Sequence, residues 1–578
     1  MCSAGDKCGF GFVSILLADN RILREHADTG AGRRLARAAF DVTAEVKSFL
    51  RIPPFPGAHL RRFTKVKRAA FSRDDLTAEI RRLRVGGCYW GAQPKLPNDY
   101  VLASSRSRLG PAKAISSGRP VILWDRAGDS FTSTTGVISG DCDPWHMLSK
   151  ASALVSEAGD ELRIVAALLN RPCFDVDGAT GDAKAVSIDP GELLSDELSE
   201  TAFENPFTGE PMDALEVVGL CGFWRNLIDS NRGIEAGIGF AFWKQSHVAP
   251  LLWNGSREFK FMRNAGGIRR GAAVAVWRAK VAAETSSELE RTGATPVEVE
   301  DGFLRSQGLG ADCIPPLSIT VDRLGAYFDP SCASELECLL QEGEFDEPLL
   351  ERAAELRRLI VEAGLGKYGR GNAVLDRPAG ERRHILVPGQ VEDDRAVTAG
   401  GCGLVSNLEL LKRVREQAPD AYILYKPHPD VIAGHRRGAI PQAACLEQAD
   451  QIVGDLPISS LIAMVDEIHV NTSLAGFEAL LREKPVTTYG VPFYAGWGLT
   501  RDLGPVPPRR SKARTLDQLV AATLLLYPRY LDPVTGLPCP AEVVVSRLSA
   551  NDRRDPGALV KVRRLQGRLM RRLRGRIQ

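Results

Sequence analysis

The stretch Tyr422-Ile-Leu-Tyr-Lys-Pro-His-Pro-Asp430 decides the fold prediction for the second half of the chain. Its first four residues form a short apolar run that predicts a buried strand. The two prolines that follow exclude a helix or a central strand. The chain therefore leaves the strand and enters a rigid loop. In parallel α/β sheets, ligands bind at loops of this kind, at the carboxyl ends of the strands.

Strands and helices alternate on both sides of this stretch. Apolar runs predict strands at 385–388, 467–470 and 486–489, and helical spacing of apolar residues predicts helices at 407–417, 461–465 and 476–482. Such alternation is typical of βα units that build a parallel sheet.

A second α/β block precedes this one. We expect strands at 272–278 and 296–299, helices at 279–291, 334–340 and 348–363, and a Gly-rich polar linker at 367–382. Two Rossmann-like halves that face a cleft form the GT-B architecture of glycosyltransferases, although a fold alone does not establish a function. We therefore predict an α/β fold with a GT-B-like module, whose N-terminal half spans 233–375 and whose C-terminal, nucleotide-binding half spans 376–548.

Residues 1–232 contain a partial repeat of this module. Gly140-Asp141 and Ala167-Leu-Leu169 recur in the same order as Gly454-Asp455 and Ala479-Leu-Leu481, and the turn at 205–211 recurs at 532–538. Similar separations with preserved order indicate a duplication, with chance similarity as the alternative. The first copy has no His-Pro pair after a strand and no Glu-Asp-Gly. We therefore predict a degenerate α/β module that is catalytically silent.

Composition excludes several classes of protein. The 578 residues include 74 Lys+Arg and 72 Asp+Glu, a net charge of +2, which favours no nucleic-acid partner. The twelve cysteines form no CxxC pair, as expected for buried thiols in a reducing compartment. No apolar run reaches 18 residues, and the apolar run at 9–18 is expected to be a buried strand. These features favour a cytoplasmic protein.

The C-terminal tail, 549–578, is basic and carries part of an apolar stripe at Val560, Val562, Leu565 and Leu569. It is either a solvated terminal helix or a basic amphipathic segment that contacts anionic lipid.

Paired carboxylates follow a predicted strand at Glu300-Asp301-Gly302. Neighbouring carboxylates perturb each other's pKa, which suits acid/base catalysis in a cleft. The alternative is a solvated turn, because Asp-Gly is a common turn dipeptide.

Two further loops could hold an anion. Lys426 and the rigid His428, held between two prolines, can donate hydrogen bonds to a phosphate, unless His428 is only a structural residue of the turn. Thr472 and Ser473 lie where a strand ends and a helix begins, so they either bind an anion or cap the helix. Glu478, within that helix, could accept hydrogen bonds from ribose hydroxyls or merely favour the helix dipole.

Glu392-Asp393-Asp394 forms an acidic loop expected at the same cleft. It is a metal candidate, a source of a carboxylate nucleophile or a solvated loop. Asp175 and Asp177 have the DxD spacing of metal-dependent glycosyltransferases, but they lie in the degenerate copy. We predict no metal site.

Together these motifs resemble one family. The resemblance rests on residues 299–306, 315–318, 327–329, 387–394, 425–430, 472–481 and 492–500. In this combination they are similar to the KpsC-type capsular polysaccharide proteins, the bacterial β-Kdo transferases of capsule lipid-linker synthesis, over about residues 240 to 545. Family members usually carry two active modules, whereas only the C-terminal module keeps the motifs here.

The resemblance implies a cytoplasmic GT-B enzyme that is peripheral at the inner membrane and works with other capsule assembly proteins. It would move Kdo (3-deoxy-D-manno-oct-2-ulosonic acid) from CMP-β-Kdo to a β-Kdo acceptor on a phosphatidylglycerol-type lipid, and the basic tail would contact the membrane surface. The resemblance assigns the nucleotide to Gln390, Lys426, His428, Pro429, Thr472, Ser473 and Glu478.

A β-linked donor that gives a β-linked product retains its configuration. Retention suggests two displacements through a covalent intermediate, which needs a carboxylate nucleophile. We choose Asp394 over Asp393 as that nucleophile, with Glu300 and Asp301 as acid/base groups. CMP is a good leaving group once its phosphate is held, so we expect no metal or other cofactor. The alternatives are a GT-B enzyme of the nucleotide-sugar epimerase type and a non-catalytic capsule assembly or export factor.

Overall fold

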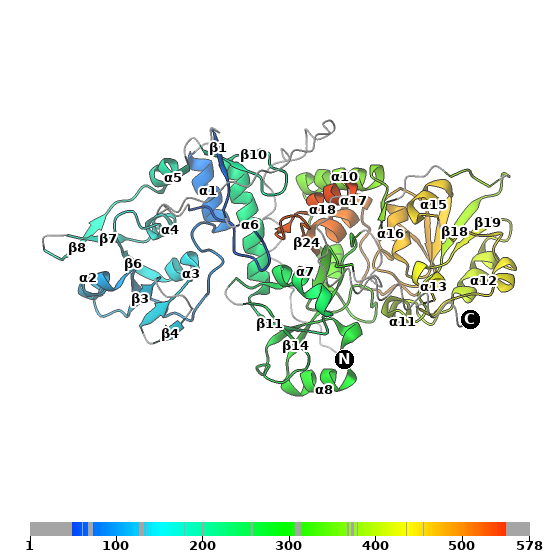
Figure 1. The fold of residues 1–578 in the computed structure, drawn as a ribbon, viewed down its shortest axis with the longest axis horizontal. Helices are drawn as coiled ribbons and strands as arrows, with labels where there is room; N and C mark the ends of the chain where they lie inside the picture. The colour runs from blue at the N-terminus through cyan, green and yellow to red at the C-terminus, as the bar shows by residue number, and fades with distance from the viewer. Residues whose placement is uncertain are drawn as a thin grey trace. The chain divides into compact units, whose positions relative to one another are not determined.

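The computed structural model describes residues 49–550, apart from 61, 68–72, 127–131, 135, 178–179, 199–200, 256–257, 307–313, 367–368, 371–374, 379, 435 and 455. These residues form two compact units (Figure 1). The N-terminal unit comprises 49–233 and 252–258, and the C-terminal unit comprises 234–251 and 259–550. The strand predicted at 9–18 and the basic tail from residue 551 onward lie outside the described residues, as does part of the linker at 367–382.

A six-stranded parallel sheet lies in the second half of the C-terminal unit, in the order β20-β19-β18-β21-β22-β23. The strands are β18 (His384–Pro388), β19 (Tyr422–Lys426), β20 (Gln451–Ile452), β21 (Glu467–Val470), β22 (Val486–Thr488) and β23 (Arg501–Asp502). The first strand, β18, lies between the second and the fourth, which is the strand order of a Rossmann fold. Ligands of such sheets bind at the switch point, here between the carboxyl ends of β18 and β21.

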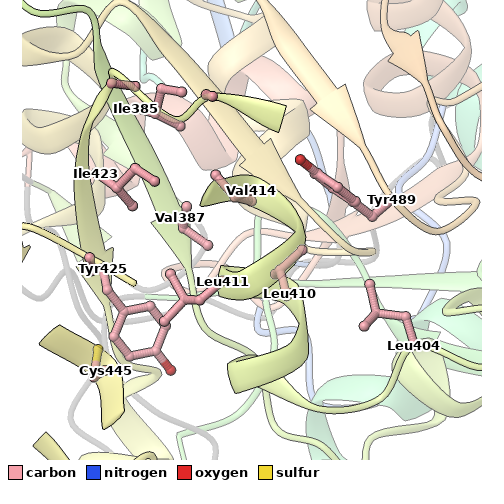
Figure 2. Close-up of a cluster of buried hydrophobic side chains, with 13 residues drawn as sticks. Ile385, Val387, Leu404, Leu410, Leu411, Val414, Ile423, Tyr425, Cys445 and Tyr489 are labelled. Atoms are coloured by element: carbon pink, nitrogen blue, oxygen red, sulfur yellow. The ribbon is translucent and has the colours of Figure 1, made fainter. Parts of the chain in front are cut away.

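Helix α12 (Asn407–Gln417) shows how this sheet is covered. The helix begins after Ser406, whose hydroxyl accepts a hydrogen bond from the Glu409 N–H. Its apolar face packs on β18 and β19 in the buried cluster of Figure 2, formed by residues including Ile385, Val387, Leu410, Leu411, Val414, Ile423 and Tyr425. Burying one aliphatic side chain of this size stabilises the fold by about 1.5–3 kcal/mol, so packing outweighs intrinsic helix propensity here.

The second sheet of the C-terminal unit is mixed. Its order is β12-β11-β13-β14-β15-β24-β25, in which the first four strands are parallel and the last three antiparallel. The bounds are β11 (Ile234–Ile238), β12 (Lys260–Met262), β13 (Ala273–Val276), β14 (Thr295–Asp301), β15 (Ser318–Asp322), β24 (Pro528–Leu531) and β25 (Pro538–Cys539). Because β24 pairs with β15, the chain returns to the first half after completing the second. The predicted half 376–548 therefore contributes two strands to the sheet of the other half.

Helix α8 (Ala283–Thr292) packs on this sheet, because its Leu289 belongs to a buried cluster with Ile238, Val274 and Val276. The same half also contains α7 (Phe242–Leu252), α9 (Glu335–Glu342) and α10 (Glu347–Glu362). Helix α10 packs against α17 (Leu516–Val520) and α18 (Ala541–Ala550), and Figure 1 shows these three helices grouped together. The C-terminal unit thus has the two Rossmann-like halves of the predicted GT-B-like module, and the predicted fold class is confirmed.

The N-terminal unit contains a seven-stranded sheet in the order β4-β5-β3-β2-β6-β7-β8. Its parallel core consists of β2 (Tyr100–Ala103), β3 (Val121–Asp125), β5 (Val137–Ser139), β6 (Ala151–Val155) and β7 (Cys173–Val176). Strand β4 (Thr132–Thr134) and strand β8 (Ala183–Val186) are added antiparallel at the two edges. A separate small sheet pairs β1 (Lys65–Lys67) with the hairpin β9 (Thr201–Glu204) and β10 (Pro211–Met212).

The strand orders of the two sheets in the N-terminal unit recur in the C-terminal unit. The core order β5-β3-β2-β6-β7 matches β20-β19-β18-β21-β22, and β1-β9-β10 matches β15-β24-β25 in order and antiparallel pairing. A long helix follows each hairpin, α6 (Ala214–Asn231) in one and α18 in the other. The expected degenerate α/β module is therefore present. Among the described residues of this unit, no strands correspond to β11–β14.

Two other expectations concern the described residues. No helix among them combines the length and apolar character needed to cross a membrane. All of their cysteines are free thiols; most are buried or half-buried, but Cys332 and Cys402 are exposed, contrary to the expectation for scattered cysteines.

Candidate active site

The ends of β18 and β21 are joined by the side chain of Gln390. Its Nε2 donates to the Thr472 hydroxyl at 3.0 Å, and its Oε1 accepts the Thr472 backbone N–H at 2.9 Å. Gln390 therefore bridges the switch point of the sheet. The predicted nucleotide residues Gln390 and Thr472 lie together there, and Gln390 fixes the position of Thr472.

Asn407 holds the loop that carries Gln390. Its Oδ1 accepts the Gln390 N–H and its Nδ2 donates to the Gln390 carbonyl, both at 2.8 Å. Its backbone N–H donates to Glu392 Oε1 at 2.8 Å. Asn407 is buried, so these bonds make the loop rigid. Asn407 was not among the predicted site residues; an Asn at the first position of the predicted helix 407–417 was the available signal.

Ser473 caps the next helix, α16 (Leu474–Leu480), because its hydroxyl accepts the Ala475 N–H at 3.2 Å. The Ser473 carbonyl accepts a hydrogen bond from the Tyr494 hydroxyl. Glu478 lies on the buried side of α16, 6% exposed, against the backbone at Gly366. A Cβ at Gly366 would lie only 2.9 Å from Glu478 Oε2. Glu478 thus faces the segment that connects the two halves.

His428 precedes the short helix α13 (Pro429–Ile432), and Pro429 is its first residue. The Asp430 backbone N–H donates to His428 Nδ1 at 3.1 Å. In the neutral ring, a nitrogen that accepts a hydrogen bond cannot carry the proton, so Nε2 is the protonated donor. The loop geometry therefore selects the tautomer that can donate to an anion.

Lys426 is the last residue of β19 and is buried. Its ammonium donates to the Gly454 carbonyl, just beyond β20, at 2.8 Å. This bond ties the carboxyl ends of two adjacent strands together beside His428.

Glu300 is buried near the end of β14, with 16% of its side chain exposed. Arg395 Nη1 lies 2.7 Å from its Oε1. Burial and the nearby Asp301 and Glu298 carboxylates outweigh Arg395 and raise the pKa of Glu300 to about 7. A carboxyl group with this pKa exchanges a proton readily near neutral pH.

Asp301, the neighbouring carboxylate, has a different environment. Lys244 Nζ lies 3.1 Å from Oδ1 and Arg305 Nε lies 2.9 Å from Oδ2. The Lys244 ammonium also lies 3.4 Å from the centre of the Trp277 ring, and burial lowers its pKa. Two cations on one carboxylate favour its charged form. The predicted pair is therefore asymmetric: Glu300 is suited to proton transfer, whereas Asp301 organises Lys244 and Arg305.

The acidic loop lies at the start of α11 (Arg395–Gly400). Asp394 is exposed and caps this helix, because its Oδ1 accepts the Ala396 N–H at 3.0 Å. Asp393 is exposed and lies 3.2 Å from Arg436 Nη2. The residue that follows Asp394 is the Arg395 that binds Glu300. The acidic loop and the end of β14 are thus adjacent.

No group of acidic, His and Cys side chains among the described residues is arranged to hold a metal ion. In the N-terminal unit, Asp175 Oδ2 pairs with Arg163 Nη2 at 3.1 Å, and Asp177 Oδ1 accepts the Thr180 N–H. The two acids of the DxD sequence therefore serve local structure.

An aromatic cluster joins the two halves of the module beside these groups. Phe303, which follows Glu300-Asp301-Gly302, has its ring centre 4.8 Å from that of Phe493 and 6.1 Å from that of Phe477. Phe477 belongs to α16, and Phe493 to the loop after β22. Packing of these rings places the end of β14 close to the start of α16.

Comparisons with known proteins give several matches. Residues 354–530 match the family described as capsule polysaccharide biosynthesis protein. The chain is 39% identical over 357 residues to the capsule polysaccharide modification protein LipA of Neisseria meningitidis serogroup A, a match that covers 61% of this chain and 50% of LipA. It is 46% identical over 236 residues to the lipopolysaccharide-processing protein LpsZ of Rhizobium meliloti, a match that covers 40% of this chain and 53% of LpsZ.

One solved structure is similar over nearly its whole length. The β-Kdo 2,7-transferase of Thermosulfurimonas dismutans KpsC is 34% identical, with 55% of this chain and 98% of that chain covered and a TM-score of 0.46. This chain spans about half the length of the curated relatives it matches.

The fold and the arrangement of these side chains define a GT-B-like α/β protein with a candidate ligand site at the switch point of its six-stranded parallel sheet. The sequence identities identify its family: the chain belongs to the KpsC-type capsule polysaccharide proteins.

Proposed function

We propose that this protein is a retaining glycosyltransferase of capsular polysaccharide biosynthesis. It moves Kdo from CMP-β-Kdo to a β-Kdo acceptor linked to a phosphatidylglycerol-type lipid. The observation that carries this proposal is the 34% identity over 98% of a β-Kdo transferase chain. The juxtaposition of the acidic loop with Glu300 in the C-terminal unit agrees with it.

In this proposal the nucleotide lies at the carboxyl ends of β18, β19 and β21. His428 donates from Nε2 to the CMP phosphate, and Thr472 and Ser473 provide hydroxyl groups beside it. Gln390 and Lys426 hold the surrounding loops in place, and Glu478 faces the nucleoside. The half 376–548 binds the donor, and the half 233–375 contributes the acid/base groups.

The reaction proceeds in two displacements. Asp394 attacks the anomeric carbon of Kdo, the bond from that carbon to the CMP phosphate breaks, and CMP leaves with the electron pair. An acceptor hydroxyl then attacks the same carbon, Asp394 is released, and the hydroxyl proton passes to Glu300. Asp301 orients Lys244 and Arg305 through its contacts with both. CMP held by hydrogen bonds is a sufficient leaving group, so we propose that no metal is required.

The N-terminal module 1–232 serves as a scaffold or acceptor platform in this proposal and is not a second transferase. The basic tail 549–578 holds the protein at the cytoplasmic surface of the inner membrane, together with other capsule assembly proteins.

The test is a transfer reaction with the full-length protein. The purified protein is mixed with CMP-Kdo, generated in situ, and a lipid-linked Kdo acceptor, and both CMP release and the acceptor mass are measured. We expect one CMP released for each Kdo added and a β-configured product by NMR. An α-configured product contradicts retention. CMP release with no dependence on the acceptor contradicts transfer.

A further inference from the structure

Arg395 connects the acidic loop to the end of β14. It is the first residue of α11 and directly follows Asp394. Its Nη1 lies 2.7 Å from Glu300 Oε1 and 3.7 Å from Glu298 Oε2. Its guanidinium carbon lies 5.0 Å from the centre of the Phe328 ring, which holds the group over the carboxylates.

Glu298 and Glu300 lie two residues apart on β14, so their side chains point to the same face of the sheet. Both are largely buried, with 10% and 16% of the side chains exposed. Two buried carboxylates on one face repel each other. Arg395 is the cation that contacts both, and a second arginine, Arg278, pairs with Glu298 alone.

The charged groups that act on Glu300 come from three elements. Arg395 comes from α11, Glu298 and Asp301 from β14 itself, and Lys244 from α7. Burial and the two acids raise the pKa of Glu300, and Arg395 and Lys244 oppose that rise. Lys244 is bound to Asp301, and the neighbouring β15 places Thr320 opposite Glu300 in the sheet. Arg395 is thus the cation in direct contact with this carboxylate.

We infer that Arg395 is a positioning residue that holds Glu300 next to Asp394 and sets the pH range in which Glu300 accepts a proton. The inference rests on the proposed function for the identity of the reaction, but the contact with Glu300 is independent of the substrate. Burial and the two neighbouring acids raise the pKa of Glu300, and Arg395 is the cation nearest to it that opposes this rise. Without Arg395, Glu300 should therefore keep its proton to higher pH.

The first experiment measures Kdo transfer as a function of pH. The wild-type rate should rise with pH with a midpoint near 7, where Glu300 loses its proton. Arg395→Gln should move this midpoint to higher pH, and Arg395→Lys, which keeps the charge, should return it most of the way. A purely structural role predicts a lower rate with an unchanged midpoint, and that result overturns the inference.

The second experiment needs no activity. Melting temperatures are measured from pH 5 to 9 for the wild type, Arg395→Gln, Glu300→Gln and the double variant. When Glu300 is present, Arg395→Gln should lower the melting temperature by an amount that increases as pH rises through 7. In the Glu300→Gln background, this increase with pH should be smaller. Equal pH dependence in both backgrounds overturns the inference. If the effect of Arg395→Gln on melting temperature depends on Glu300 but the protein transfers no Kdo, the proposed function is refuted and the role of Arg395 toward Glu300 is still supported.

Discussion

We assign two roles to His428, and substitution can distinguish them. Its Nδ1 caps α13 by accepting the Asp430 N–H, and its Nε2 is the donor that we assign to the CMP phosphate. Asparagine is also a good N-cap residue, because its side-chain oxygen can accept the same N–H. His428→Asn should therefore keep the cap and remove the phosphate donor, whereas His428→Ala removes both.

The expected magnitudes differ for the two roles. A lost hydrogen bond to a charged phosphate weakens binding by about 1.5–3 kcal/mol, or about 10- to 150-fold in CMP affinity. A lost N-cap lowers the free energy of unfolding by about 1 kcal/mol. We expect both variants to lose CMP affinity to a similar extent, and only His428→Ala to lose stability as well.

Isothermal titration with CMP gives the affinities, and thermal melting without CMP gives the stabilities. If His428→Asn binds CMP as tightly as the wild type, His428 acts only as a cap and the phosphate assignment is refuted. A thermal melt of His428→Asn that matches the wild type is the control that the loop has kept its structure.

Four further predictions follow from the same geometry. Raising the folded-state pKa of Glu300 from 4.5 to about 7 makes its ionisation destabilising, so wild-type stability should fall as pH rises through this range. Between pH 5 and pH 8.5, the free energy of unfolding of Glu300→Gln should therefore rise relative to that of the wild type by about 2.5 kcal/mol in urea unfolding. Asp394→Asn, which keeps the cap on α11, should abolish Kdo transfer but leave CMP affinity within about threefold by titration. Gln390→Ala, which removes both bonds to Thr472, should weaken CMP binding and lower the melting temperature, because it leaves a polar group at the switch point without its partner. Titration of the full chain should give one CMP per molecule, and a second site of similar affinity would contradict a silent N-terminal module.

Much of the C-terminal half was predictable from local sequence. The helix at 407–417 and the strand at 467–470 have the same bounds in the structure as in the prediction. Apolar periodicity determines which face of α12 is buried, and Ser406 and Pro419 mark its ends. The loops that follow β18, β19 and β21 were predictable for the same reason, because parallel strands bring their carboxyl ends to one edge.

The partners within the site were less predictable. Arg395 meets Glu300 across 95 positions of sequence, and Lys244 meets Asp301 across 57. No local pattern indicates such contacts, because the first depends on how the two halves pack and the second on packing within the first half. From the sequence there was therefore no reason to assign different roles to Glu300 and Asp301. The cations around them in the structure distinguish the two. The pairing of β24 with β15 in the mixed sheet was not predicted for a similar reason, because the sequence of a strand does not indicate which strand it pairs with.

The N-terminal unit shows how a duplicated sheet can keep its core while its switch point changes. Arg163 is buried there and donates to the Ser156 hydroxyl at 3.0 Å and to the Ser156 carbonyl at 2.7 Å. Asp160 accepts the Leu162 N–H and pairs with Arg126 at 2.6 Å, with only 3% of its side chain exposed. An incoming phosphate would face this buried carboxylate, and separating the pair would leave a buried charge uncompensated.

At the corresponding ends of β18 and β21, the neutral side chains of Gln390 and Thr472 bond to each other. A neutral amide and hydroxyl can rearrange around an anion at small cost, whereas a buried ion pair resists separation. We therefore expect the anion site at this sheet edge in the C-terminal unit and none at the corresponding edge of the N-terminal unit, where Asp160 is paired with Arg126. This difference in charge pairing agrees with our assignment of the chemistry to the C-terminal unit alone.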